Sequence, residues 1–241
     1  MEHIDKVKGI YPPNRQSAPQ NRTVSTAVIR RLPRYHRYLG QLLREGKARI
    51  SSLELSQRMC VTASQIRQDL NCFGGFGQQG YGYHVQYLYD KIGELLGVNE
   101  HYSAVFVGLG HLGHSLVSSA MLERRGIRKL AIFEKDPALV GQTVAGLPVL
   151  PSEETESWCR RHKVDLAVLA VPREQAQSMA EALARAGVRG IWNFSDTELD
   201  LHIDGMEIEN MHLSDALLGL CYRLRTSKEP QSDAGREEDG Q

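Results

Sequence analysis

The stretch AVFVGLGHLGHSL, residues 104–116, constrains the fold of this chain more than any other segment. An apolar run leads into Gly108-x-Gly110-x-x-Gly113, and a helix-like pattern follows at once. In a βαβ unit, the first glycine makes the tight turn, the second lets a pyrophosphate approach the backbone, and the third lets helix and strand pack closely. We therefore expect a dinucleotide at the helix N-terminus. A glycine-rich turn without a ligand is the alternative that the motif leaves open.

Strand-like and helix-like segments alternate after residue 103, which predicts an α/β fold of the Rossmann type with a doubly wound parallel sheet. The expected strands are 104–107, 130–133, 166–171, 190–194 and 206–208. The expected helices are 112–125, 152–162, 173–186 and 214–225.

A carboxylate ends the second expected strand, at Glu134. It would accept both ribose hydroxyls and repel a 2′-phosphate, which favours NAD(H) over NADP(H), although Lys135 opposes this preference. Ligands of such sheets lie at the carboxyl ends of the strands. The expected cofactor-binding residues are Gly108, Leu109, Gly110, His111, Leu112, Gly113, Glu134, Lys135, Ala170, Val171, Pro172, Asn193, Phe194 and Ser195.

The front of the chain has a helical pattern. An apolar stripe, Val28, Leu32, Tyr35, Leu39 and Leu42, predicts one helix, which Pro33 either kinks or begins. Two capping boxes, at 51–54 and 62–65, open two short helices with a very short link, the proportions of a helix-turn-helix. Five glycines interleaved with aromatics in 74–83 predict a β-hairpin wing, and 84–97 predict a connecting helix with Val85, Leu88, Ile92, Leu95 and Leu96 on one side.

Charge supports a nucleic-acid partner for this front part. Residues 23–83 hold nine Lys and Arg against three Asp and Glu, whereas the rest of the chain holds 20 against 26. A basic segment joined to an acidic one indicates binding to a polyanion. The expected DNA-binding residues are Arg34, Ser64, Gln65, Arg67, Gln68, Gln78, Gln79, Gly80 and Tyr81, and Arg30, Arg31, Lys47, Arg49 and Arg58 are further candidates for phosphate contacts.

Other classes of protein fit the sequence less well. The chain has no apolar run that would span a membrane and no apolar secretory segment near residue 1, so we expect it in the cytoplasm. Its four cysteines lack metal-site spacing, so we expect them reduced and half-buried, and we expect no metal site. Residues 1–22 are expected to be a flexible arm and 226–241 a disordered tail.

The chain resembles the Rex family of bacterial redox-sensing transcriptional repressors from about residue 24 to 225. The motifs that carry the likeness are RRLPRYHRYL, SSLELSQ, VTASQIRQDLNCFGGFGQQGYGY, VGLGHLGHSL, FEKDPALVGQTVAGLPV, LAVPREQAQ and GIWNFS. The resemblance implies a homodimer that binds a palindromic DNA operator and releases it when NADH binds. It also implies a winged-helix domain at 23–98, a Rossmann domain at 99–211 and an exchanged C-terminal helix at 212–225.

The resemblance also implies a nucleotide-reading switch that differs in this chain. An Arg of the first helix matches Arg37, but its family partners, a Tyr and an Asp, are replaced by Ser119 and His212. A hydroxyl bond to a charged carboxylate contributes about 1.5–3 kcal/mol, so its loss would bias the switch tenfold or more. Gln68, and Gln78 and Gln79 in the wing, stand where the family has basic residues.

Four interpretations of function follow. The first is a repressor that responds to the NADH/NAD⁺ ratio and has no catalytic residues. The second is a divergent relative that prefers NAD⁺, senses weakly or binds another adenine nucleotide. The third is a DNA-binding scaffold that keeps the Rossmann domain only for dimerisation. The fourth, an NAD-dependent oxidoreductase, is disfavoured because the segment after the Rossmann strands is too short for a substrate domain.

Overall fold

The computed structural model describes residues 24–73, 77–78, 82–200 and 205–226. The chain divides into two compact units, 1–98 and 99–241. Three residues expected to bind DNA, Gln79, Gly80 and Tyr81, lie outside the described residues, as do the expected arm and nearly all of the expected tail.

The front unit contains four helices and a small sheet among its described residues. They are α1 (Thr26–Arg44), β1 (Arg49–Ile50), α2 (Ser52–Met59), α3 (Ala63–Asn71), β2 (Gly77–Gln78), β3 (Gly82–His84) and α4 (Val85–Leu95). The expected stripe of α1 is buried, from Val28 to Leu42. Pro33 lies inside α1, so the alternative that it begins the helix is wrong.

The two expected capping boxes differ in the structure. The Ser51 hydroxyl accepts the Glu54 N–H and the Glu54 side chain accepts the Ser51 N–H, so the first box is complete. The Thr62 hydroxyl accepts the Gln65 N–H at 3.1 Å, but the Gln65 side chain turns to Asp69 instead of returning to Thr62. The second box is therefore only half formed, because a partner farther along α3 binds the side chain that would complete it.

The wing strands form a three-stranded sheet in the order β1-β3-β2, with both neighbours antiparallel to β3. The hairpin was expected, whereas the two-residue strand β1 is too short to show a sequence pattern. In α4, Val85, Leu88 and Ile92 are buried, whereas Leu95 near the end of the helix is 48% exposed.

The second unit is built on a seven-stranded sheet in the order β10-β9-β8-β4-β5-β7-β6. Its strands are β4 (Ser103–Val107), β5 (Arg128–Glu134), β6 (Thr143–Val144), β7 (Leu147–Pro151), β8 (Leu166–Leu169), β9 (Gly190–Asn193) and β10 (Glu207–Asn210). All pairs are parallel except β6 with β7, two strands that the sequence pattern did not predict. Strand order reverses at β4, as in dinucleotide-binding folds.

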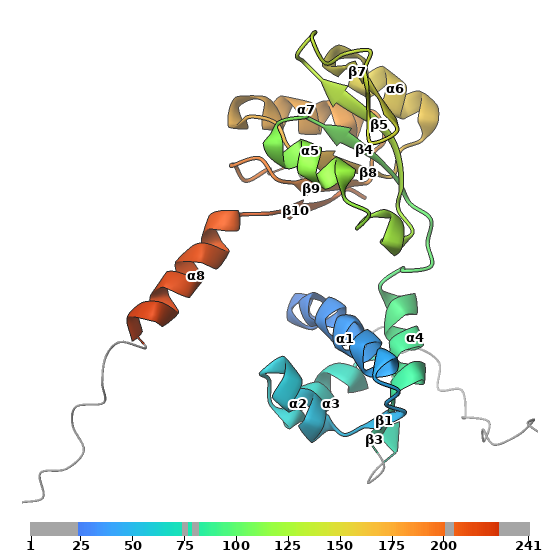
Figure 1. Cartoon of the computed structure of the whole chain (residues 1–241), viewed down its shortest axis with the longest axis vertical. Coiled ribbons are helices and arrows are strands. Elements are labelled where there is room, and N and C mark those ends of the chain that lie inside the picture. Colours follow the sequence, from blue (N-terminus) through green and yellow to red (C-terminus); the bar gives the residue numbers. More distant parts are fainter. Residues whose placement is uncertain (1–23, 74–76, 79–81, 201–204, 227–241) are drawn as a thin grey trace, which may run out of the picture. The chain divides into compact units, whose positions relative to one another are not determined.

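Helices cover both faces of this sheet (Figure 1), which matches the expected fold class. On one face, Val105 and Val107 of β4 pack in a core with α6 (Thr155–His162) and α7 (Arg173–Arg185). On the other, Phe106 packs with Val117 of α5 (His111–Ser118). Side chains alternate along a strand, so one five-residue strand is buried on both sides.

Helix α5 ends seven residues earlier than expected. The ammonium of Lys129 on β5 donates to the carbonyls of Val117 and Ser119, at 2.6 and 3.2 Å, and forms an ion pair with Glu123. The last carbonyls of a helix lack partners within it, and this cation supplies one. A separate 3-10 turn, Glu123–Arg125, follows.

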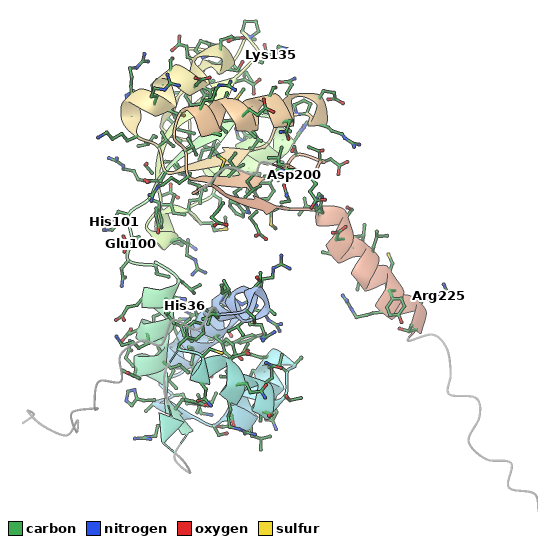
Figure 2. All side chains as sticks on the ribbon, turned by 180° about the vertical axis from the view of Figure 1, so that it is seen from behind. His36, Glu100, His101, Lys135, Asp200 and Arg225 are labelled. Carbon is green, nitrogen blue, oxygen red and sulfur yellow. The ribbon has the colours of Figure 1, made fainter. Side chains whose placement is uncertain are left out.

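The C-terminal helix α8 (Leu213–Thr226) has no buried residue. Its large apolar side chains are exposed, namely Leu213, Leu217, Leu218, Leu220, Tyr222 and Leu224. Figure 2 draws them as sticks, with Arg225 labelled in the last turn.

Cys159 is buried, which raises its pKa to about 12, but Cys60, Cys72 and Cys221 are exposed, so the expectation of half-burial is wrong. No helix in the described ranges is long and apolar enough to cross a membrane.

Candidate nucleotide and DNA sites

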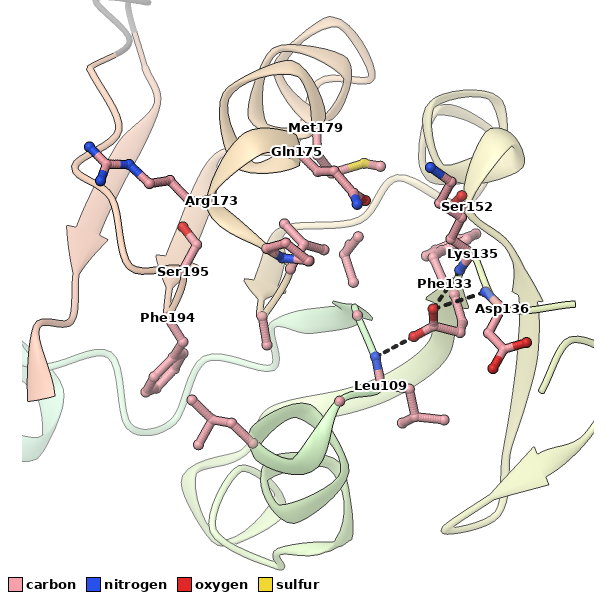
Figure 3. A pocket seen from close by; sticks show the side chains of 18 of the residues that line it. Leu109, Phe133, Lys135, Asp136, Ser152, Arg173, Gln175, Met179, Phe194 and Ser195 are labelled. Atoms are coloured by element: carbon pink, nitrogen blue, oxygen red, sulfur yellow. Dashed lines mark hydrogen bonds between the residues drawn. The ribbon is translucent and has the colours of Figure 1, made fainter. Parts of the chain in front are cut away.

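A pocket of about 690 Å³ lies where β4, β5 and β8 end in the second unit (Figure 3). It is lined by the glycine loop, by the residues that follow β5 and β8, and by the first turns of α5 and α7. This is the point where the strand order reverses, the usual ligand position in doubly wound sheets. The volume is within the range of small-molecule sites.

The three loop glycines have different surroundings. Gly108 has φ +93°, and a methyl group there would meet the carbonyl oxygen of Ala170. A methyl group at Gly113 would meet the carbonyl oxygen of Gly108. At Gly110 a methyl group would have no atom within 4 Å. Two of the glycines are therefore required by packing, and Gly110 alone keeps open space clear beside the pocket.

The start of α5 has no side-chain cap. Its N-cap is Gly110, whereas α2 and α3 begin with capping hydroxyls. The first N–H groups of a helix have no partner within it, and together with the helix dipole they favour a bound anion. The backbone at this edge of the pocket is thus suited to a diphosphate.

The carboxylate of Glu134 is held by backbone amides. Oε2 accepts the N–H of Leu109 at 2.6 Å, and Oε1 accepts those of Lys135 and Asp136 at 2.7 and 3.1 Å (Figure 3). These bonds join the end of β5 to the glycine loop. They fix a negative charge in the pocket wall.

The structure brings together most of the expected cofactor-binding residues. Those lining the pocket are Gly108, Leu109, Gly110, His111, Leu112, Glu134, Lys135, Ala170, Val171, Pro172, Phe194 and Ser195. Gly113 is instead packed beneath the loop. Asn193 is fully buried, where its amide donates to Thr197 and Asn210 and its oxygen accepts from Ser195.

Several lining residues were missed by sequence reasoning. They are Val107, Phe133, Asp136, Ser152, Arg173, Gln175, Met179 and Asp196. Arg173 directly follows the expected Pro172, so its place at a strand end was available as a signal. Ser152 directly follows β7, a strand that the sequence pattern did not predict, and Met179 lies within α7, which the strand-end rule does not cover.

The altered switch segment in the second unit is held by local bonds. Ser119 is half-buried, and its hydroxyl accepts the Met121 N–H at 3.2 Å. His212 directly precedes α8 and is half-buried. In the front unit, Arg37 is exposed, with its guanidinium carbon 5.4 Å from the Tyr38 ring centre.

The expected DNA-reading helix is α3, whose Ser64, Arg67 and Gln68 are exposed while Gln65 is half-buried. Arg67 donates to the Ser52 hydroxyl at 3.1 Å. Arg34 donates to the Met59 carbonyl at 2.7 Å, at the end of α2. Both arginines are therefore oriented by the helix that precedes α3.

Several expected phosphate-binding cations have acidic partners. Lys47 pairs with Glu54 and Arg58 with Glu45, both at exposed positions. Arg31 pairs with Asp69 of α3, whose side chain is 0% exposed. Burial opposes ionisation of Asp69, but hydrogen bonds from Arg31, Gln65 and Tyr35 outweigh it and hold the pKa of this carboxyl below its ordinary value. Burial and the bond to Asp69 raise the pKa of Tyr35.

No group of three or more His, Cys, Asp or Glu residues is arranged to hold a metal ion in the part of the chain that the structure describes.

Comparisons with known proteins cover both units. Residues 23–71 match the family described as putative DNA-binding protein N-terminus, and residues 99–197 match the CoA binding domain. The redox-sensing transcriptional repressor Rex of a Thermoanaerobacter species is 48% identical over 83% of this chain and 89% of its own. The protein of the same name from Clostridium beijerinckii is 45% identical over 87% of this chain and 99% of its own.

Solved structures agree with these relatives. RSP in complex with β-NAD⁺ and operator DNA matches with a TM-score of 0.80 and 46% identity, over 86% of this chain and 95% of that chain. RSP in complex with β-NADH matches with a TM-score of 0.79 and 43% identity, over 86% and 97%. The similarity therefore spans the small helical unit and the sheet unit together.

Proposed function

The chain belongs to the Rex family of redox-sensing transcriptional repressors, and we propose that it holds an operator through its front unit and responds to NADH/NAD⁺ through its second unit. The observation that carries this proposal is that one chain joins a helix-turn-helix to an uncapped glycine-loop pocket. The structure of RSP, which matches this chain across both units, has been solved in complex with β-NAD⁺ and operator DNA. The relatives of this chain are named as transcriptional repressors, and we propose that this chain is likewise a repressor and not an enzyme.

The pocket supports NAD(H) as the ligand. The open α5 N-terminus would hold the diphosphate, and the Glu134 carboxylate would face the adenosine ribose and disfavour a 2′-phosphate. The cofactor-binding residues that we propose are the predicted ones that line the pocket, which leaves out Gly113 and Asn193, with Phe133, Arg173 and Met179 added from the pocket wall.

The DNA partner is a palindromic operator bound by a homodimer, because two recognition helices related by two-fold symmetry enter successive major grooves. The exposed apolar residues of α8 support an exchange of this helix between subunits. An apolar hollow of about 530 Å³ beside β9 and β10, lined by Met121, Trp192 and Ile208 among others, is a candidate position for the partner's α8. Sedimentation of the full chain is expected to show a dimer, and Leu217→Glu combined with Leu220→Glu is expected to weaken it.

A second candidate function is the same repressor with an altered nucleotide response. It is favoured by Ser119, whose hydroxyl accepts a hydrogen bond from the Met121 N–H. The serine side chain is also too short to reach as far as the phenol of a tyrosine. His212 likewise replaces a carboxylate. In this version NAD⁺ strengthens operator binding, or NADH releases the operator only weakly.

Because a repressor acts on DNA, we place the protein in the cytoplasm.

One experiment separates these candidates. Binding of the full chain to a palindromic operator is measured with NAD⁺, NADH, NADP(H), ATP or no nucleotide. Release by NADH alone supports the standard sensor, and binding that requires NAD⁺ supports the altered switch. Indifference to every nucleotide overturns redox sensing and leaves a DNA-binding scaffold. Turnover of NADH with a small carbonyl compound would contradict the assignment as a repressor without catalysis.

A further inference from the structure

Asp69 is a buried acceptor on the DNA-reading helix α3. Its Oδ2 accepts from Nε of Arg31 at 2.6 Å and from the Tyr35 hydroxyl at 2.9 Å. Its Oδ1 accepts from Nη2 of Arg31 at 2.7 Å and from Nε2 of Gln65 at 2.8 Å. Each carboxylate oxygen thus receives two donors, and the side chain is fully buried.

This network fixes the direction of the Gln65 amide. An ionised carboxylate can only accept hydrogen bonds, so it binds the NH₂ end of the amide and would repel the oxygen end. A glutamine without such a partner can turn its amide over and present either a donor or an acceptor. Asp69 binds one N–H of Nε2 and so turns the amide oxygen away from itself, and Arg31 and Tyr35 in turn hold Asp69 in place.

The amide oxygen of Gln65 stays outside the network. No hydrogen bond to this Oε1 is found in the described part of the chain. Every buried side-chain oxygen and nitrogen there has a hydrogen-bond partner, so an oxygen without one is not buried. The oxygen therefore reaches solvent. Gln65 is the third residue of α3, and the first residues of a recognition helix are those that contact base edges in the major groove.

We propose that Gln65 reads the operator through its amide oxygen, as a hydrogen-bond acceptor, with Asp69 as the residue that sets the direction of the amide. The recognised group is an exocyclic amino group, N6 of adenine or N4 of cytosine, because these are the donors that bases display in the major groove. The O6 of guanine and the O4 of thymine are acceptors and would face the Gln65 oxygen unfavourably. This inference rests on the proposed binding of operator DNA.

The test begins with an operator selected by the full-length chain from a randomised palindromic duplex library. Each adenine in one half-site is then replaced by purine and each cytosine by 2-pyrimidinone, which removes the amino group and keeps the rest of the ring. Wild-type protein is expected to lose about tenfold in affinity at one base pair. Gln65→Ala is expected to bind the amino-bearing and amino-free duplexes equally. Whether the loss occurs at a replaced adenine or at a replaced cytosine shows which amino group Gln65 recognises.

Two variants sharpen the result. Gln68→Ala, the matched control on the same helix, is expected to keep the tenfold loss at the Gln65 base pair. Asp69→Asn, which can donate as well as accept, is expected to discriminate less between amino and carbonyl groups there, provided that circular dichroism shows it folded. If it does not fold, the comparison of Gln65→Ala with wild type on the base analogues still decides.

The outcomes distinguish this inference from the proposed function. If wild type selects an operator but Gln65→Ala weakens all duplexes by the same factor, Gln65 does not read a base and the inference is wrong. If removal of the amino groups costs the wild type no affinity at any base pair although Gln65→Ala weakens operator binding, the polarity is wrong. If wild type selects no operator at all, both the proposed function and this inference fail.

Discussion

The N-termini of α3 and α5, one in each unit, are built in opposite ways. Helix α3 begins at a Thr62 hydroxyl that accepts the Gln65 N–H, so part of its donor set is used internally. Helix α5 begins at Gly110 with no side-chain cap. In the function that we propose, the first helix offers side chains to its ligand, and the second offers its backbone. A base edge is read by side-chain donors and acceptors, whereas a diphosphate needs only N–H groups and a close approach.

The two units also fix their sites by different means. The front unit anchors α3 to α1 through the ion pair of Asp69 and Arg31. The second unit anchors the loop by steric contact, because Gly108 and Gly113 leave no room for a side chain. Removal of a charge is therefore expected to break the first site, and addition of a methyl group the second.

The largest effect is expected for Arg31→Leu, which leaves the Asp69 carboxylate buried without its cation. Removal of one partner of a buried ion pair costs about 3–5 kcal/mol, and the lower value applies because Arg31 is 23% exposed. Urea denaturation followed by circular dichroism measures the loss. Both tryptophans, Trp158 and Trp192, belong to the second unit, so its fluorescence transition is expected to stay in place.

The control for that variant is Lys47→Leu, whose ion pair with Glu54 has side chains 36% and 47% exposed. Exposed pairs contribute about 1 kcal/mol or less. Equal losses for the two variants would contradict the view that the buried pair anchors α3.

The next largest effect is expected for Gly113→Ala in the second unit. The new methyl group would overlap the Gly108 carbonyl oxygen, so the loop and α5 must separate. Overpacking of this kind costs about 1–3 kcal/mol. Tryptophan fluorescence in urea reports the loss, and an unchanged midpoint would show that the loop is not packed as described.

A smaller effect, on binding and not on folding, is expected for Gly110→Ala. The methyl group has no atom within 4 Å, so it enters the open space where a diphosphate would lie. We expect about a tenfold loss of affinity for NAD⁺ and NADH, equivalent to about 1.4 kcal/mol. Calorimetric titration measures it, with the fluorescence midpoint as the folding control. Undiminished affinity would place the nucleotide elsewhere.

The last prediction concerns the protonation of Asp69, which lowers the stability of the front unit only in acid and has the smallest effect at neutral pH. The folded-state pKa of Asp69 lies below that of an unfolded Asp, which is about 3.9. The stabilisation is therefore present above that unfolded value and is lost as the pH falls through the lower folded value. Acid titration by circular dichroism is expected to unfold the wild-type front unit more steeply than Asp69→Asn. Equal slopes would show that other carboxyls dominate.

Features that depend on neighbouring residues were predictable from the sequence. The stripe of α1, the complete capping box at Ser51 and the glycine loop involve spacings of a few residues, where the backbone geometry fixes the contacts. Most of the pocket wall followed too, because parallel strands bring their carboxyl ends together at one edge.

The same kind of local reasoning was wrong where a group outside the expected motif bound a side chain or a carbonyl. The pattern at Thr62 predicted that Gln65 would return to its own helix start, but Asp69, held by Arg31 38 positions away, binds it. Helix α5 was predicted to be longer, but Lys129 binds its carbonyls. Lys129 lies outside the segment that it alters, and Asp69 lies on the same helix as Gln65 but is held by an arginine of α1.

The sequence by itself determined the order of the two units, the glycine loop and the position of the helix that we propose to read DNA, because each depends on local spacing. Only the tertiary structure decided the side chains that are tied down and the direction in which they point. Glu134 is bound to the amide of Leu109, and Gln65 is turned by a buried carboxylate. A hydrogen-bond direction depends on which groups meet in space, and folding alone brings those groups together.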